Sequence, residues 1–251
     1  MKLGGWIAAL CPLIAAVTAP VLAQQLELPA LLVQFDNEHN LAAKEHLLLS
    51  VTTQGSSAGP SLLRLAQSTT NTDTRWMAMR GMATLHCTSC ASFLEASLED
   101  SDALIRANAA RALGDLGIKE ASDSLRAMFA AEKNGPAVQQ TSLTLSRLDI
   151  RAAVPDIRKK IPEFTGQTRV WLIQALGHLG SAADVPLVAG FLDEMMSGQM
   201  ATEALQELTG VDFDIHHSGL SGIPSPETLR AQAWWKSHKD AWPRCDDCSR
   251  K

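Results

Sequence analysis

The chain has 251 residues, of which 46% are hydrophobic and 20% charged, and its formal net charge is −5. This composition is that of a folded globular protein and excludes a disordered or fibrous chain, while 5% aromatic residues without a single Tyr favour helices over a β-sandwich or barrel. The acidic balance argues against general binding to nucleic acid or to anionic lipid.

The first 23 residues have the pattern of a secretory signal peptide. Lys2 gives a positive start, residues 3–17 are apolar, and Val21 and Ala23 stand at the small-residue positions before a cleavage site. We expect cleavage near Ala23 and a mature protein that is periplasmic or secreted, without an integral membrane span. An uncleaved N-terminal anchor is the alternative, although the apolar run is short for a membrane span.

The rest of the chain repeats at a nearly constant interval. Six segments carry two apolar residues three positions apart near the end of a helical stretch, and the steps between their first members are almost equal. The period, about 31 residues, fits a pair of helices joined by tight turns. The pairs are Leu48 and Val51, Met82 and Leu85, Leu113 and Leu116, Leu145 and Leu148, Leu176 and Leu179, and Leu205 and Leu208.

The segment from Asp102 to Gly117 shows the pattern of one unit. Asp102 is placed to cap the start of a first helix, and Gly117 to end it in a left-handed conformation. Apolar residues between them recur at steps of three and four, which is typical of a helix with one buried face. A second helix follows, and we expect Leu125, Met128 and Phe129 on its buried side.

Two later units repeat this arrangement. Val154-Pro155 and Val185-Pro186 lie one repeat period apart, each in the first turn of a predicted second helix, where Pro is tolerated because its missing N–H has no partner within the helix. The predicted first helices cover 138–148 and 169–179, and the second helices cover 152–161 and 183–192.

These segments resemble HEAT-like repeats of the short bacterial type known from bilin lyases, most closely in Arg106–Gly117 and Arg169–Gly180 with their Ala-Leu-Gly-x-Leu-Gly endings. The resemblance covers Leu41 to Gly210. It implies an all-α fold, an α-solenoid of about five to six stacked antiparallel helix pairs with a C-terminal capping helix. The lyase activity is not carried over, because an exported protein would not meet pigment-bearing antenna proteins.

The resemblance also implies a long concave surface, lined by the second helices, that binds a protein or peptide. The candidate partner-binding residues on these helices are Arg126 and the basic run Arg158, Lys159 and Lys160. The run would contact an acidic partner, or it is simply a solvated helix face.

The C-terminal region has a different composition from the repeats. A loop rich in Gly, Pro and Ser precedes a predicted helix that contains Trp234 and Trp235. We expect this helix, with Phe213, to cover the apolar end of the array, and an aromatic ligand platform is the alternative. The predicted organisation is therefore a signal peptide (1–23), a lead-in (24–40), a HEAT-like solenoid (41–210), and a loop with capping helix and Cys-x-x-Cys tail (211–251).

Catalytic motifs are absent from the sequence, so we predict no catalytic residue and no cofactor. Asp212, Asp214 and His216 alternate and would lie on one side of an extended segment, where they form a weak candidate for a metal site. Polar residues in a loop are the simpler explanation.

Two Cys-x-x-Cys pairs remain after cleavage of the signal peptide. Cys87 pairs locally with Cys90 and Cys245 with Cys248 in our preferred prediction of two disulfides, because an even number of Cys in an exported chain favours them. Cross-pairing, a zinc site and free thiols stay open.

The sequence thus predicts an exported, non-enzymatic scaffold that binds another protein through the concave face of the solenoid. One alternative is a periplasmic thiol–disulfide or metal-handling protein that uses the two cysteine pairs. Another is an enzyme with a site across the concave face.

Overall fold

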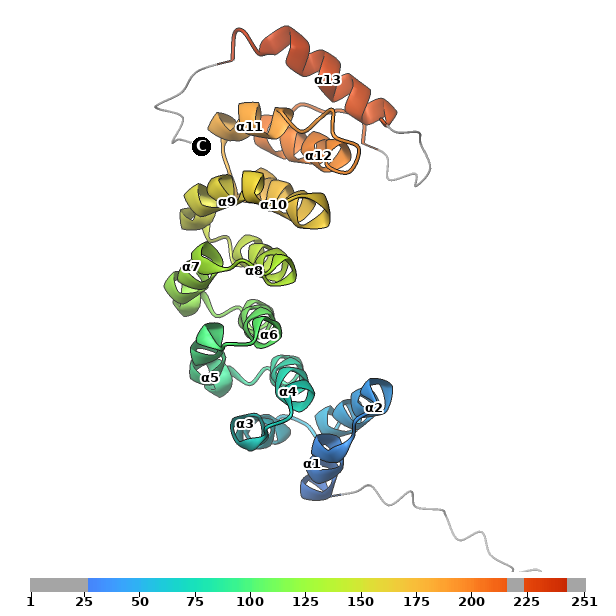
Figure 1. Cartoon of the computed structure of the whole chain (residues 1–251), viewed down its shortest axis with the longest axis vertical. Coiled ribbons are helices and arrows are strands. Elements are labelled where there is room, and N and C mark those ends of the chain that lie inside the picture. Colours follow the sequence, from blue (N-terminus) through green and yellow to red (C-terminus); the bar gives the residue numbers. More distant parts are fainter. Residues whose placement is uncertain (1–26, 216–223, 243–251) are drawn as a thin grey trace, which may run out of the picture.

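The computed structural model describes residues 27–215 and 224–242, and in this part of the chain all regular structure is helical. The predicted signal peptide 1–23 lies outside the described residues. No described helix has both the length and the apolar character that a membrane span would need. The helices stack in two rows, which confirms the predicted α-solenoid (Figure 1).

The first helices of the units form one row and the second helices the other. The first row comprises α2 (Leu41–Thr52), α4 (Thr72–Thr84), α6 (Ala103–Asp115), α8 (Gly135–Arg147), α10 (Gly166–Leu179) and α12 (Gly198–Thr209). The second row comprises α3 (Ala58–Ser68), α5 (Ala91–Ala96), α7 (Ser122–Ala131), α9 (Val154–Lys160) and α11 (Val185–Ala189). Helix α1 (Leu28–Asn37) packs on α2 and α3, and α13 (Pro226–His238) packs on α12.

The apolar pairs in the sequence set the register of the stack. The first member of every pair is buried, which confirms the predicted period. The buried first members are Leu48, Met82, Leu113, Leu145, Leu176 and Leu205. Since no helix pair can bury its apolar side alone, each unit depends on its neighbours for this core.

Three units end their first helix with the same backbone turn. His86, Gly117 and Asp149 occupy it with φ of 52°, 71° and 54°. In the second of these turns the Ile118 amide donates to the carbonyl of Leu113 at 3.0 Å, and equivalent bonds close the other two. This is the Schellman arrangement, which satisfies carbonyl groups left open at a helix end. The prediction that Gly117 ends its helix in the left-handed conformation is confirmed.

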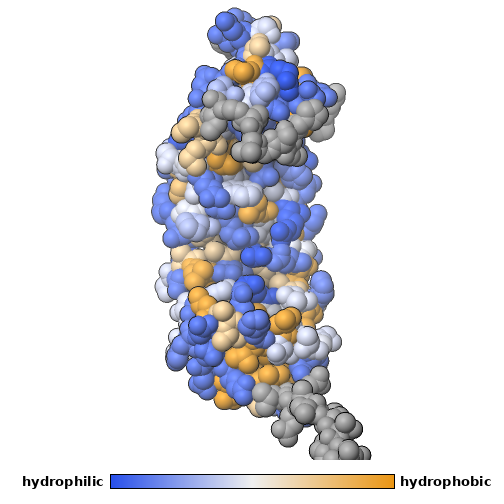
Figure 2. Space-filling view, turned by 90° about the vertical axis from the view of Figure 1, so that its right-hand side faces the viewer, coloured by the Kyte–Doolittle hydropathy of each residue, from blue (hydrophilic) through white to orange (hydrophobic). Residues whose placement is uncertain are grey.

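The first helices lie on the inner side of the curve, and the prediction that the second helices line the concave face is wrong (Figure 1). Small residues allow the first helices to approach each other closely. A Cβ on Gly114 would come within 3.0 Å of Thr144, and one on Gly177 within 2.7 Å of the Ala204 backbone. The second helices have fewer direct contacts with one another, so the stack bends toward the first row. Figure 2 looks onto this inner, largely polar face.

The array begins before the predicted start at residue 41. Helix α1 lies within the expected lead-in 24–40, and its Leu31 and Phe35 side chains are buried against the core. The lead-in is therefore part of the stack, although it lacks the paired apolar signal by which the sequence marks the first helices.

The C-terminal end of the array carries the predicted capping helix. Phe213 is buried and meets the ring of Trp234 edge-on at 5.7 Å between centroids, while Trp235 lies beside Trp234. Arg230 donates to the Phe213 carbonyl at 2.8 Å, and Trp242 donates to the Ala182 carbonyl at 3.0 Å. These contacts hold α13 across the last repeat, where an apolar end would otherwise be open to solvent.

Candidate functional site

Polar contacts connect neighbouring helices of the outer row. Arg126 of α7 pairs with Asp156 of α9 at 3.3 Å, and Arg158 of α9 donates to both carboxylate oxygens of Asp184. Asp184 is almost completely buried, and its hydrogen bonds raise the pKa of Arg158 above the usual value of a guanidinium. Each of these two interfaces therefore carries a cation matched by an anion.

The interface between α5 and α7 departs from this pattern. Glu95, Arg126 and Arg158 are equivalent, since each stands at the same step in sequence after the first member of its unit's apolar pair. Glu95 thus places a carboxylate where the other units have a guanidinium. It accepts a hydrogen bond from Ser124 at 2.6 Å, and Ser124 is the equivalent of Asp156. A neutral donor has replaced the charged partner, so the negative charge is not balanced.

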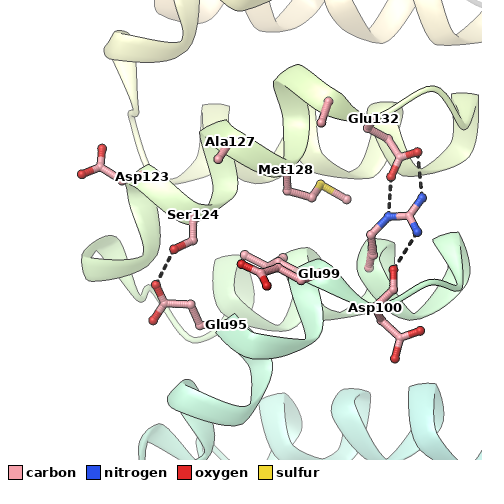
Figure 3. Close-up of a pocket in the computed structure, with 11 residues that line it drawn as sticks. Glu95, Glu99, Asp100, Asp123, Ser124, Ala127, Met128 and Glu132 are labelled. Atoms are coloured by element: carbon pink, nitrogen blue, oxygen red, sulfur yellow. Dashed lines mark hydrogen bonds and ion pairs between the residues drawn. The ribbon is translucent and has the colours of Figure 1, made fainter.

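An open groove of about 650 Å³ runs along this interface (Figure 3). Its floor is apolar and includes the buried side chains of Leu98 and Met128. Glu95, Glu99 and Asp123 stand along its sides, and neither Glu99 nor Asp123 forms an ion pair with any described residue. The groove therefore combines an apolar floor with an excess of negative charge.

A buried ion pair closes one end of the groove. Arg106 donates to both oxygens of Glu132 at 2.7 and 2.9 Å, and also to the carbonyl of Asp100 at 2.8 Å (Figure 3). Burial alone would raise the pKa of Glu132, but the hydrogen bonds from Arg106 and from two backbone amides lower it below its usual value. Glu132 is therefore a fixed anion, and its charge is used within the stack.

A lysine fills the corresponding space between α7 and α9. Lys160 is the equivalent of Met128, since the two residues stand at the same step after the first member of the apolar pair in their units. Its ammonium donates to the Glu132 carbonyl at 2.8 Å and lies 5.5 and 5.9 Å from the ring centroids of Phe129 and Phe164. Burial lowers the pKa of Lys160.

The four predicted partner-binding residues have different surroundings. Arg126 and Arg158 form the ion pairs between outer helices, and Lys160 is only 2% exposed. Lys159 is exposed and, unlike the other three, makes no ion pair with the described residues. All four lie on the outer row, so they do not form one surface on the concave side.

The structure places the first cysteine pair in the turn that leads into α5. The sulfur atoms of Cys87 and Cys90 lie 2.06 Å apart, and both residues are buried. In two later units the equivalent residues are apolar and buried or partly buried. They are Ile118 with Ala121 and Ile150 with Ala153. Cys245 and Cys248 lie outside the described residues, so their predicted bridge stays a prediction.

The two described carboxylates of the metal candidate after α12 have partners within the protein. Asp212 accepts a hydrogen bond from the Asp214 amide at 2.7 Å, and the Asp214 carboxylate lies 3.5 Å from Arg230. The third candidate, His216, lies outside the described residues. Within the described ranges, no three His, Cys, Asp or Glu side chains are grouped as metal ligands.

The sequence reasoning missed the groove residues Glu95, Glu99 and Asp123. The sequence did contain a signal for this site. When the repeats are aligned by their apolar pairs, Glu95 occupies the position that Arg126 and Arg158 have in later units. The apolar floor, however, depends on how far α5 and α7 separate, which the alignment does not give.

The comparison with protein families agrees with the repeat assignment. The family model for HEAT repeats matches residues 59–146, a range that includes α5, α7 and the groove between them. A solved structure similar to this chain is a subunit in the complex of CpcE and CpcF of phycocyanin lyase from Nostoc sp. PCC7120. It is 15% identical, with a TM-score of 0.40, and the match covers 90% of this chain and 99% of that one. No curated protein matches the sequence.

Proposed function

We propose that this protein is an exported, non-enzymatic scaffold that binds a segment of another protein in the groove between α5 and α7. The observation that carries the proposal is the groove itself, an apolar floor bordered by Glu95, Glu99 and Asp123, which form no ion pair with any described residue. Its volume of about 650 Å³ is that of a typical binding pocket. The binding surface is therefore on the outer row and not on the concave face.

The charge of the groove indicates the chemistry of its partner. Glu99 belongs to η2 (Ser97–Glu99) and borders the floor, and Asp123 lies in the first turn of α7 at the outer end of the groove, with its carboxylate turned outward (Figure 3). An extended or helical segment that carries an apolar side chain between Lys or Arg residues would bury the former and pair the latter. An acidic segment would be repelled.

The export proposal rests on the N-terminal sequence pattern and is supported by the cysteines. In an oxidising compartment Cys87 and Cys90 would form a disulfide that fills the space of an Ile and an Ala in other units. Cys87 is 8% exposed and Cys90 is fully buried. The Cys87 sulfur packs closely on Gly59 of α3, since a Cβ on Gly59 would lie 3.1 Å from it. This packing favours a structural bridge over thiol–disulfide exchange, since exchange needs an accessible sulfur.

The test compares two variants that change the net charge equally. Glu99→Arg places a cation in the groove, and Asp240→Arg makes the same change at an exposed site beyond α13. Each protein captures partners from the periplasmic fraction of its source cells, followed by chemical crosslinking and mass spectrometry. We expect the main captured protein to bind Glu99→Arg about tenfold more weakly, because one attractive contact becomes repulsive, and to bind Asp240→Arg as it binds wild type. An equal loss of binding to the captured protein in both variants, or no loss of binding in either, would contradict the proposal.

A further inference from the structure

The N-terminal end of the array presents an uncovered ridge along α1. Pro29, Val33 and Asn37 are exposed and recur at every fourth position, so they form one row along the helix. Val33 is 60% exposed, which is high for a large apolar side chain. In a solenoid this end is the face on which a preceding helix pair would stack.

A groove lies on each side of the ridge, and Val33 lines both. One, of about 360 Å³, separates α1 from α3 and contains Leu32, Leu65 and Arg64. The other, of about 610 Å³, separates α1 from α2 and contains Leu47. Figure 2 shows apolar residues gathering at this lower end of the array, where α1 and α2 lie.

The opposite end of the array shows what a covered end looks like. There α13 lies across the last repeat and buries Phe213. At the N-terminal end, cleavage after Ala23 would leave only Gln24, Gln25 and Leu26 before Glu27. This step rests on the proposed export, because three residues are too few to cover the ridge.

We infer that a second copy of this chain covers this end, so that two molecules associate end to end through α1 across a two-fold axis. A surface that has both a ridge and a groove beside it is self-complementary, because the ridge of each copy can enter the groove of the other. The α1–α3 groove also contains a cation and an anion, Arg64 and Asp36, so a two-fold contact sets the cation of each copy against the anion of the other.

The experiment measures self-association of the mature chain, residues 24–251, by sedimentation velocity over a range of concentrations. We expect a monomer–dimer equilibrium. Val33→Asp should weaken it about 100-fold, because the substitution occurs twice in a two-fold interface and each copy costs about tenfold. Leu104→Asp is the control, since Leu104 is also an exposed apolar residue but lies on α6. A chain that stays monomeric, or equal weakening by both substitutions, would overturn the inference.

A photocrosslinking amino acid at position 33 gives an independent readout that needs no destabilising substitution. It should link to α1 or α3 of the second copy and produce a species of twice the mass, while the same probe at position 104 should not. Crosslinks confined to a single chain would overturn the inference. Because the groove between α5 and α7 is remote from α1, Glu99→Arg should leave dimerisation unchanged, so failure of this inference and failure of the proposed function are distinguishable.

Discussion

Two neighbouring interfaces of the outer row occupy the same place in the repeat and have opposite side-chain chemistry. Between α7 and α9, Arg126 pairs with Asp156 and the buried Lys160 fills the remaining space. Between α5 and α7, Glu95 and Met128 occupy the equivalent positions, and an open acidic groove remains. The difference indicates that the side chains facing the gap between outer helices can vary, because both interfaces rest on equivalent buried apolar residues, Leu94, Leu125 and Ile157.

The charged side chains of the interface between α7 and α9 bind partners within the stack. The carboxylates along the groove between α5 and α7 are available to a partner protein. Arg126 and Lys160 have their partners on adjacent helices, and their loss would leave polar groups unpaired. Neither Glu99 nor Asp123 forms an ion pair within the described part of the chain. A repeat that departs from its neighbours without a gain in stability is where a binding function is expected.

The largest effects should come from the core that both interfaces share. Leu113→Ala and Leu176→Ala each remove a fully buried side chain from the same place in different units, and each should cost roughly 2–5 kcal/mol of unfolding free energy because a cavity remains. Urea denaturation of both variants measures this. A loss below about half a kcal/mol at both positions would show that the repeat register is wrong.

The ion pair at the end of the groove should give the next largest effect, with a defined pH dependence. Glu132→Gln should destabilise the protein by about 2 kcal/mol at pH 7, because Arg106 loses its carboxylate partner. The pKa of Glu132 is lower in the folded than in the unfolded protein. The carboxylate therefore contributes its full stabilisation of wild type above the unfolded-state pKa of about 4.3, and this stabilisation is lost as pH falls through the folded-state pKa.

The difference in free energy of unfolding between Glu132→Gln and wild type, measured by urea denaturation, should therefore become smaller as pH is lowered from about 5 to below 4. Glu99→Gln serves as the control, since Glu99 makes no ion pair with the described residues. A difference that is constant with pH would mean that the carboxylate charge of Glu132 does not contribute to stability.

The open interface can be converted to the closed pattern by two substitutions. Glu95→Arg together with Ser124→Asp reproduces the pair formed by Arg126 and Asp156. The free energy of unfolding should change by less than about 1 kcal/mol, as is typical of partly exposed ion pairs. Partner capture should fall about tenfold, since the groove loses negative charge. Unchanged capture would show that the partner does not use this groove.

The reverse conversion should have the smallest effect. Lys160→Met introduces the residue found at the equivalent position of the open interface. We expect the free energy of unfolding at pH 7 to change by no more than about 1 kcal/mol, because loss of the hydrogen bond to the Glu132 carbonyl is offset by removal of a buried charge. The lowered pKa of Lys160 means that wild type gains stability as pH rises toward the unfolded value of about 10.4.

The Lys160→Met variant should therefore lose stability relative to wild type between pH 7 and pH 10, as urea denaturation at several pH values would measure. Lys159→Met, at an exposed neighbouring position, should show no such trend. A parallel pH dependence of wild type and Lys160→Met would show that the Lys160 amine is not buried in solution.

The sequence by itself determined the features that depend on residues close together in the chain. The spacing of the apolar pairs established the period, Asp102 and Gly117 marked the ends of a helix, and the aromatic residues of α13 predicted a cap. These signals are local, because helix ends and amphipathic faces follow from residues within one or two turns.

The tertiary structure alone decided which row lies inside the curve, where the outer side chains are held and which gap stays open. The curvature follows from the distance between helices of successive units, which close contacts such as Gly177 with Ala204 set from one repeat to the next. The same holds for Lys160, which the sequence presents as part of a basic run and the structure buries against Glu132 of the preceding unit. Burial of a charged side chain is a property of its neighbours in space, and in a stack of repeats those neighbours commonly belong to another unit.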